Sequence, residues 1–271
     1  MLSLSIQPSS SSLTPQRLIL DLLDADPQAM AFSRRLLAAG GVFNFTSNQM
    51  RVSLSRLVSD GLLEKPSRGL YQLSERAARL RTEIQCWRHL EQQLIPWHGN
   101  WLAIACGNLA ADSSAHFRRQ QRALALRGLQ RWRPGIWVRP DNLHGGLEQL
   151  VIDLQALDLD AIQGSFRIEQ ADDSCQRELI SLWDSLVLDK EYQQRLVQLR
   201  DANERLTSAS PALLSETMEL GSDTVRFLLM DPLLPEELVN HDNRRALVAA
   251  MVDYDANGRK LWQQFIDALE A

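Results

Sequence analysis

The segment TSNQMRVSLSRLVSDGLLEKPSRGLYQLS, residues 46–74, constrains the fold of this 271-residue chain more than any other. Its first half has apolar side chains at helical spacing and ends at a glycine, as helices commonly do. Thr46 and Gln49 have the spacing of a capping box, so we expect the helix to begin there. Two short apolar runs then flank the turn PSRG, which predicts a β-hairpin. The stripe expected to be buried consists of Met50, Leu54, Leu57 and Val58.

Two further helices are predicted before this segment. TPQRLILDLLDAD has Thr14 as an N-cap and Pro15 at the first helical position. PQAMAFSRRLLAAGG, residues 27–41, predicts a second helix that Gly40 and Gly41 end. Three helices followed by a hairpin make a winged helix-turn-helix, which we assign to residues 14–90.

The outward face of the third predicted helix has donors and acceptors of mixed type. Asn and Gln can pair bidentately with adenine, Arg with guanine, and Val can touch a thymine methyl group. An arginine at the tip of the wing can enter a minor groove or contact phosphate. The alternative is an ordinary surface helix in a protein-interaction module. The residues predicted to bind DNA are Thr46, Ser47, Asn48, Gln49, Arg51, Val52, Ser55, Arg56 and Arg68.

The rest of the chain predicts two more domains, and we expect residues 1–13 to be a flexible leader. Strand-like and helical runs alternate in residues 91–173, which favours a small ferredoxin-like α+β domain. Residues 174–271 have helical apolar spacing throughout and predict a helical C-terminal domain. The expected fold class is therefore α+β.

The charge is divided unevenly along the chain. Residues 1–139 hold 18 Lys and Arg against 9 Asp and Glu, a net charge of +9. Residues 140–271 hold 11 against 25, a net charge of −14. This asymmetry suggests that a polyanion meets the front half only. Three scattered cysteines, no signal peptide and no long apolar run predict a cytoplasmic chain with no membrane span.

A second arginine-rich stretch, HFRRQQRALALRGLQRWRPGIWVRP, follows at residues 116–140. Guanidinium groups favour phosphate, and tryptophans can stack on a ring, so an anionic effector such as a nucleotide or coenzyme A thioester is one interpretation. The alternatives are extra contact with the DNA backbone or a solvated helix face with the tryptophans in the core. The candidate effector residues are Arg118, Arg119, Arg122, Arg131, Trp132 and Arg133.

Catalytic and metal-binding motifs are absent from the sequence. There is no GxSxG, HExxH, P-loop or GxGxxG pattern, so we expect neither an enzyme nor a cofactor. The five histidines do not have metal-ligand spacing. Residues 253–264 begin like a calcium loop but have Gln264 where a bidentate Glu is needed, and the helical phase continues through them.

Five segments, taken in their order along the chain, resemble the PaaX-like transcriptional regulators, the phenylacetate-degradation repressor family. They are LSRLVSDGLLE (54–64), LIPWHGNWLAIACG (94–107), LRGLQRWRPGIWVRP (126–140), LWDSLVLDKEYQQRL (182–196) and RFLLMDPLLPEELV (226–239).

This resemblance implies a winged-helix domain, a central domain similar to the Cas2-type ferredoxin-like fold, and a helical C-terminal domain. It also implies a homodimer that binds double-stranded operator DNA, represses a catabolic operon and dissociates when an acyl-coenzyme A such as phenylacetyl-CoA binds. Two alternatives remain open from the sequence. One is a metal-dependent nucleic-acid-processing enzyme, and the other is a scaffold that binds a partner protein.

Overall fold

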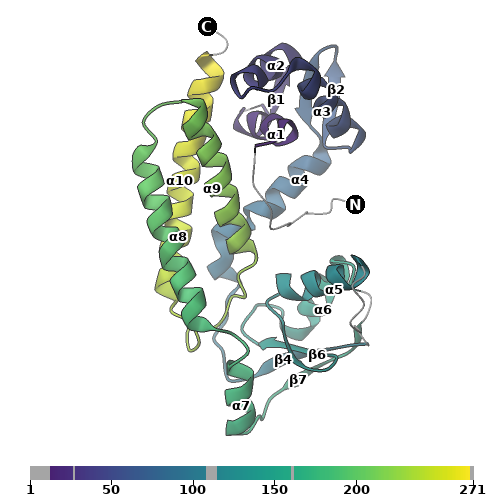
Figure 1. Ribbon diagram of the computed structural model, residues 1–271. Coiled ribbons are helices and arrows are strands. Elements are labelled where there is room, and N and C mark those ends of the chain that lie inside the picture. The colour runs from purple at the N-terminus through teal and green to yellow at the C-terminus, as the bar shows by residue number, and fades with distance from the viewer. Residues whose placement is uncertain (1–12, 27, 108–114, 160–161, 269–271) are drawn as a thin grey trace. The chain divides into compact units, whose positions relative to one another are not determined.

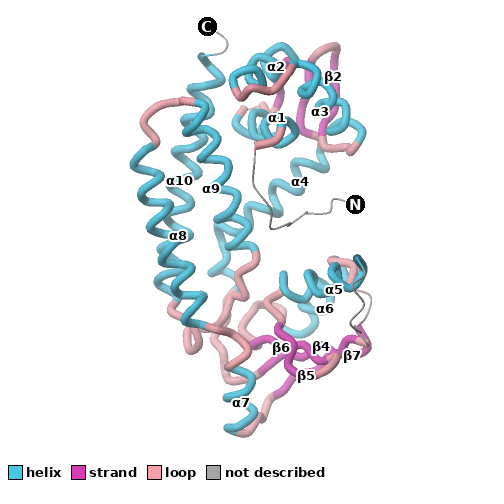
Figure 2. Tube along the Cα trace, in the orientation of Figure 1, coloured by secondary structure: helices cyan, strands magenta, loops and turns pink. Residues whose placement is uncertain are grey.

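The computed structural model describes residues 13–26, 28–107, 115–159 and 162–268. Its helices and antiparallel sheets make an α+β fold with a helical C-terminal part (Figures 1 and 2). The chain divides into two compact units. Unit 1 comprises residues 1–86, 196–226 and 249–271, and unit 2 comprises residues 87–195 and 227–248. Most of the predicted leader, residues 1–12, lies outside the described residues.

Unit 1 begins with three helices and a small sheet. The order is α1 (Pro15–Ala25), β1 (Met30–Phe32), α2 (Ser33–Val42), α3 (Ser47–Ser59), β2 (Leu63–Ser67) and β3 (Leu70–Leu73). The side chain of Thr14 accepts a hydrogen bond from the Arg17 amide, which confirms the predicted N-cap. The sheet has the order β1-β3-β2, and both pairings are antiparallel. Helix α4 (Glu75–Ile84), which we did not predict, follows the hairpin.

The prediction of one helix over residues 27–41 is wrong in two respects. Residues 30–32 form β1, which pairs with β3 at the sheet edge, because the apolar run AMAF suits a short strand as well as a helical turn. Gly40 and Gly41 lie inside α2 and do not end it. A Cβ atom on Gly40 would lie 2.5 Å from Cγ of Met50, so this glycine permits the close approach of α2 and α3.

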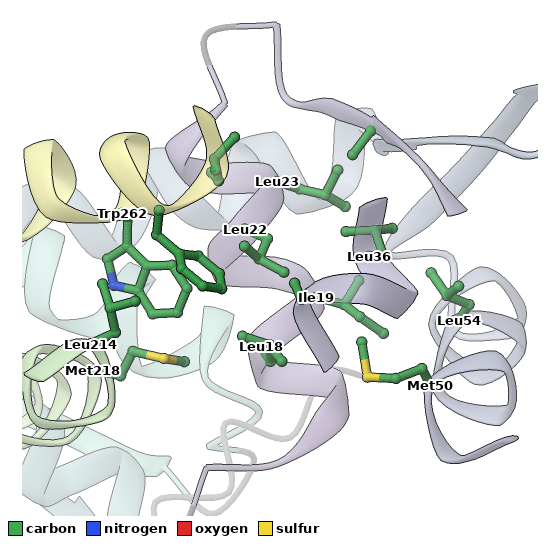
Figure 3. Close-up of a cluster of buried hydrophobic side chains, with 14 of the residues drawn as sticks. Leu18, Ile19, Leu22, Leu23, Leu36, Met50, Leu54, Leu214, Met218 and Trp262 are labelled. Carbon is green, nitrogen blue, oxygen red and sulfur yellow. The ribbon is translucent and has the colours of Figure 1, made fainter. Parts of the chain in front are cut away.

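A single apolar core joins these helices to the C-terminal part of unit 1 (Figure 3). Leu18, Ile19 and Leu23 of α1 are fully buried in it. Leu214 and Met218 of α9 (Pro211–Leu229) and Trp262 of α10 (His241–Ala268) belong to the same cluster. Burial of apolar area contributes about 25 cal/mol per Å², so this shared core stabilises α1 to α3 together with α9 and α10.

Unit 2 contains a four-stranded antiparallel sheet. Its elements are β4 (Trp101–Cys106), α5 (Ala115–Leu126), β5 (Gln130–Arg133), β6 (Ile136–Pro140), α6 (Gly146–Ala156) and β7 (Ile162–Ile168), with strand order β5-β6-β4-β7. We did not predict β5. The strand is short and mostly exposed, and for this reason its sequence lacks the apolar alternation that indicates a strand. Residues from α5 and α6 pack with β4 and β6 in one core that contains Leu124, Leu154 and Trp137. The burial of Trp137 agrees with the core interpretation of this tryptophan.

A buried arginine attaches a C-terminal loop to this sheet. Arg139 of β6 is 2% exposed, and its guanidinium donates hydrogen bonds to the carbonyl oxygens of Arg127, Pro140 and Pro232. Asn142 also donates to the carbonyl of Leu233, at 2.7 Å. Burial of the guanidinium, and to a smaller extent the nearby positive charge of Arg127, lowers the pKa of Arg139 to about 10.

The C-terminal part is helical, as expected, but its first helix is divided. We predicted one helix over residues 176–206, whereas the structure has α7 (Asp173–Ile180) and α8 (Ser185–Arg205). The side chain of Asp184 accepts a hydrogen bond from the Val187 amide and so caps α8. Helix α10 continues without interruption through residues 253–264, so this segment is helical and does not form a loop.

Helices α8, α9 and α10 each contribute residues to both units. We predicted that they would form a C-terminal domain of their own. The two compact units instead divide the C-terminal helices at residues 195, 226 and 248. The expected boundary at residue 90 lies close to the first division between the units, at residues 86 and 87. The three-domain organisation stays a prediction.

Candidate nucleic-acid interface

Helix α3 begins with the capping box that the sequence predicted. The backbone amide of Gln49 donates to Oγ1 of Thr46 at 3.2 Å, and the backbone amide of Thr46 donates to Oε1 of Gln49 at 2.8 Å. Two amides at the start of the helix are therefore satisfied by these side chains. The cap fixes the first turn, and with it the direction of every outward side chain on α3.

One side of α3 is buried in the unit 1 core. Met50, Leu54 and Leu57 are each at most 2% exposed, as predicted. The prediction that Val58 belongs to this stripe is wrong, because its side chain is 37% exposed and Ser53 is buried in its place. Val58 lies four residues after Leu54 but at the edge of the stripe, where a small rotation of the helix decides which side chain is covered.

The opposite side of α3 is open to solvent and has no negative charge. The helix contains no Asp or Glu. Within the part of the chain that the structure describes, neither Arg51 nor Arg56 has an ion pair, so both guanidinium groups are available to an external anion. The residues of the predicted face that are exposed are Thr46, Ser47, Asn48, Gln49, Arg51, Val52, Ser55 and Arg56.

Gln49 has a role that restricts its use in base recognition. Its Oε1 atom accepts from the backbone amide of Thr46 and also from the Thr46 hydroxyl, at 3.0 Å. An amide that reads adenine bidentately must offer both its oxygen and its nitrogen. While the cap is closed, Gln49 can offer only its nitrogen, so Asn48 is the better suited of the two to bidentate hydrogen bonding.

The hairpin that follows α3 presents a further cation. Arg68 is exposed in the turn between β2 and β3, and Gly69 beside it has a φ of +79°, a conformation that favours glycine. The hairpin strands are tied by a hydrogen bond from Gln72 to Glu64, at 3.0 Å. The Lys65 ammonium lies 5.9 Å from the ring centroid of Tyr71. The structure thus holds Arg68 outward on a short, braced hairpin.

The sequence reasoning missed two exposed residues near this hairpin, Phe32 and Arg34. Phe32 ends β1, and Arg34 lies in the first turn of α2. Both were assigned to the middle of a single long helix, where neither would stand out. The signal that could have found them is the sequence FSRR, in which the aromatic residue ends a short apolar run and two arginines follow one residue later.

The candidate effector residues lie on two elements of unit 2. Arg118 and Arg119 are exposed on α5, and Arg122 is half-buried there, while the other three are on β5. The guanidinium of Arg133 pairs with the carboxylate of Glu178 and lies 4.8 Å from the ring centroid of Trp132. These hydrogen bonds from Arg133 lower the pKa of Glu178 below its ordinary value. Arg133 is therefore already neutralised by a side chain of the same unit.

Neither a metal-binding cluster nor a membrane span is found in the described part of the chain. No three His, Cys, Asp or Glu side chains gather there in a way that could hold a metal ion. None of the helices there has the length and apolar character needed to cross a bilayer. The strongest candidate for a functional surface is the exposed face of α3 with the adjoining hairpin, because that face has exposed amide and guanidinium groups and α3 contains no carboxylate.

Comparison with known proteins gives a fold and no function. No protein-family model matches the chain, and no curated protein matches it. The chain is similar in structure to the uncharacterised protein Rv0674 from Mycobacterium tuberculosis, with a TM-score of 0.65 and 23% sequence identity. The similarity covers 96% of this chain and 100% of that one. It therefore extends over the fold as a whole.

Proposed function

We propose that this protein is a sequence-specific DNA-binding transcriptional regulator whose helix α3 reads the major groove. The observation that carries the proposal is the outward face of α3. It combines exposed Asn48, Arg51 and Arg56 with a complete absence of carboxylates, on a helix whose other side is firmly buried. Amide and guanidinium groups in this combination match adenine and guanine edges.

The order of elements around α3 supports the proposal. Unit 1 begins with three helices, a strand after the first of them and a hairpin after the third. The strand and the hairpin together form a sheet with the order β1-β3-β2. This order agrees with a winged helix-turn-helix, in which α3 would be the recognition helix and the β2–β3 hairpin would be the wing. In such a domain Arg68 at the wing tip contacts phosphate or enters a minor groove.

Unit 2 supports the family resemblance that the sequence suggested. Its β-α-β-β-α-β order and strand order β5-β6-β4-β7 agree with the ferredoxin-like domain that we propose for it. The PaaX-like resemblance implies a homodimer that represses a catabolic operon. A two-fold dimer would place two copies of α3 on half-sites about one DNA turn, roughly 34–36 Å, or a multiple of it apart.

Release from DNA is the second part of the proposal. An acyl-coenzyme A thioester would bind unit 2 and favour a dimer geometry that no longer fits the half-site spacing. Arg118, Arg119 and Arg122 on α5 would contact the phosphates, and Arg133 on β5, which is paired with Glu178, would contribute less. Arg131 and Trp132, the other two residues proposed on β5, would complete the site.

Nuclease footprinting of the DNA upstream of the protein's own gene tests the proposal. The purified chain should protect two similar half-sites at nanomolar to micromolar concentration. An acyl-coenzyme A panel should then include one member that removes the protection, while free coenzyme A does not. Uniform weak protection of all sequences would contradict sequence-specific regulation. Protection that no thioester removes would leave DNA binding intact and reject the proposed effector class.

A further inference from the structure

The end of β1 and the start of α2 lie beside the wing tip. In the β1–β3 ladder, Phe32 is paired with Leu70, and in the β2–β3 ladder Ser67 is paired with the same Leu70. The backbone amide of Ser33 donates to the carbonyl oxygen of Gly69 at 2.7 Å. The turn that presents Arg68 is therefore bonded directly to the first residue of α2.

Two side chains at this junction are exposed to solvent. The ring of Phe32 is 51% exposed. The guanidinium of Arg34 lies 5.6 Å from its ring centroid, within the range of a cation–π contact. This contact orders Arg34 over an apolar surface without neutralising its charge. Across the described ranges, Arg34 and Arg68 have no ion pair, in contrast to Arg35, which pairs with Asp26 at 3.2 Å.

We propose that Phe32, Arg34 and Arg68 form one DNA-backbone clamp that grips the strand flanking the bases read by α3. The three residues are called the clamp below. The two guanidinium groups would bind phosphate oxygens, and the Phe32 ring would pack on the deoxyribose between them. The inference rests on the proposed function and adds Phe32 and Arg34, which lie outside α3 and the wing.

The chemistry of the clamp fits a duplex backbone better than a base edge. A guanidinium binds phosphate through two parallel N–H donors, and its partner ring cannot donate or accept a hydrogen bond. The hydrogen bond from Ser33 to Gly69 joins the two backbone segments that present Arg34 and Arg68, so both guanidinium groups would reach the same stretch of DNA backbone. A clamp of this kind contributes affinity and register and carries no sequence information.

The test is a salt titration of DNA affinity by fluorescence anisotropy, on the footprinted site and on scrambled DNA. For Arg34→Ala, affinity should fall on both DNAs by the same factor. The slope of log affinity against log salt should become shallower by about 0.9, the value for one lost phosphate contact. Arg34→Lys keeps the charge and should restore the slope. Phe32→Ala should weaken binding to both DNAs and leave the slope unchanged.

Arg79→Ala is the matched control, because Arg79 is an exposed arginine of unit 1 that pairs with Glu75 on α4. It should leave both affinity and slope as in the wild type. Thermal unfolding of each variant would show that it is folded at the assay temperature.

The clamp is rejected if Arg34→Ala binds both DNAs like the wild type while Arg51→Ala loses affinity, and the proposed function then stands. If the wild type itself shows no salt-sensitive binding to either DNA, the proposed function fails and the clamp with it. A loss confined to the footprinted site would also overturn the clamp, because it would make Arg34 a base reader.

Discussion

The ring of Phe43 is stacked on the indole of Trp262, with ring centroids 5.8 Å apart and an interplanar angle of 17°. Phe43 lies in the turn between α2 and α3, and Trp262 lies on α10. Phe265, one turn further along α10, meets the same phenyl ring edge-on at 5.7 Å. The segment that leads into α3 is thus held by the C-terminal helix, so any displacement of α10 must be accommodated at the start of α3.

Replacing Trp262 should show how much of unit 1 depends on this contact. Its indole N–H also donates to Thr217 of α9, at 3.1 Å. Trp262→Ala should lower the free energy of unfolding by about 3–5 kcal/mol, since it removes a buried aromatic side chain. Trp262→Phe keeps an aromatic ring and should cost less. Urea unfolding monitored by circular dichroism measures both, and equal losses would mean that the ring contact with Phe43 contributes little.

Changing Gln49 separates its capping role from DNA recognition. In Gln49→Glu the side chain still accepts from the Thr46 amide and places a negative charge at a helix N-terminus, where it is favoured by about 0.3–1 kcal/mol. Stability should therefore be kept or slightly raised. DNA affinity should fall, because a carboxylate would face the phosphates. Unchanged affinity in anisotropy would mean that the first turn of α3 does not approach DNA.

The adjacent glycines of α2 form a matched pair. Gly40→Ala would place a Cβ atom against the side chain of Met50, and overpacking of this kind typically costs about 1–3 kcal/mol. A Cβ atom on Gly41 would meet nothing within 4 Å, so Gly41→Ala should stabilise the helix by about 0.5–1 kcal/mol. Differential scanning calorimetry should give melting shifts of opposite sign. Shifts of the same sign would contradict the packing of α2 on α3.

Arg139 should contribute far more to the stability of unit 2 than the exposed Arg131 on the neighbouring strand β5. Arg139→Ala removes the hydrogen bonds to the carbonyl oxygens of Arg127, Pro140 and Pro232, which are buried or partly buried, at a cost of about 2–4 kcal/mol. Arg131 pairs with Trp137 in the β5–β6 ladder but is exposed, and Arg131→Ala should change stability by less than about 0.5 kcal/mol. Chemical unfolding of the two variants compares them directly. Similar losses would show that the Arg139 contacts are not a main support of unit 2.

The three cysteines should differ in reactivity. Cys86 is exposed, Cys175 is partly exposed and Cys106 is buried in the core of unit 2. Burial raises the pKa of the Cys106 thiol to about 11, so very little thiolate is present at pH 8. A disulfide reagent should label Cys86 fastest and Cys106 only after unfolding. Cys86→Ser should remove the fast phase, and a fast phase that persists would mean that another thiol is open.

The sequence predicted those parts of the fold that rest on local chemistry. The cap at Thr46, the buried Met50, Leu54 and Leu57 and the hairpin turn at Gly69 all depend on residues within a few positions of one another. The exposure of Arg51 and Arg56 followed from the same periodicity, because the opposite side of an amphipathic helix must face outward.

Long-range packing could not be read from the same patterns. Gly40 looks like a helix stop, and only the position of Met50 shows that it is a site of close contact. Strand β1 is defined by its pairing with β3, and the exposed position of Phe32 depends on that pairing. Ser53 is buried and Val58 is exposed, a difference at the edge of the apolar stripe that the helical period alone does not reveal.

The measurement that tests the central claim most directly is the ratio of affinities for the footprinted site and for scrambled DNA, in the wild type and in Arg51→Ala/Arg56→Ala. If α3 reads bases, each lost guanine contact removes about 1–3 kcal/mol of discrimination, so the ratio should collapse toward one. Arg200→Ala, an exposed arginine on α8, should leave it unchanged. A double variant with the wild-type ratio would show that α3 does not read the sequence.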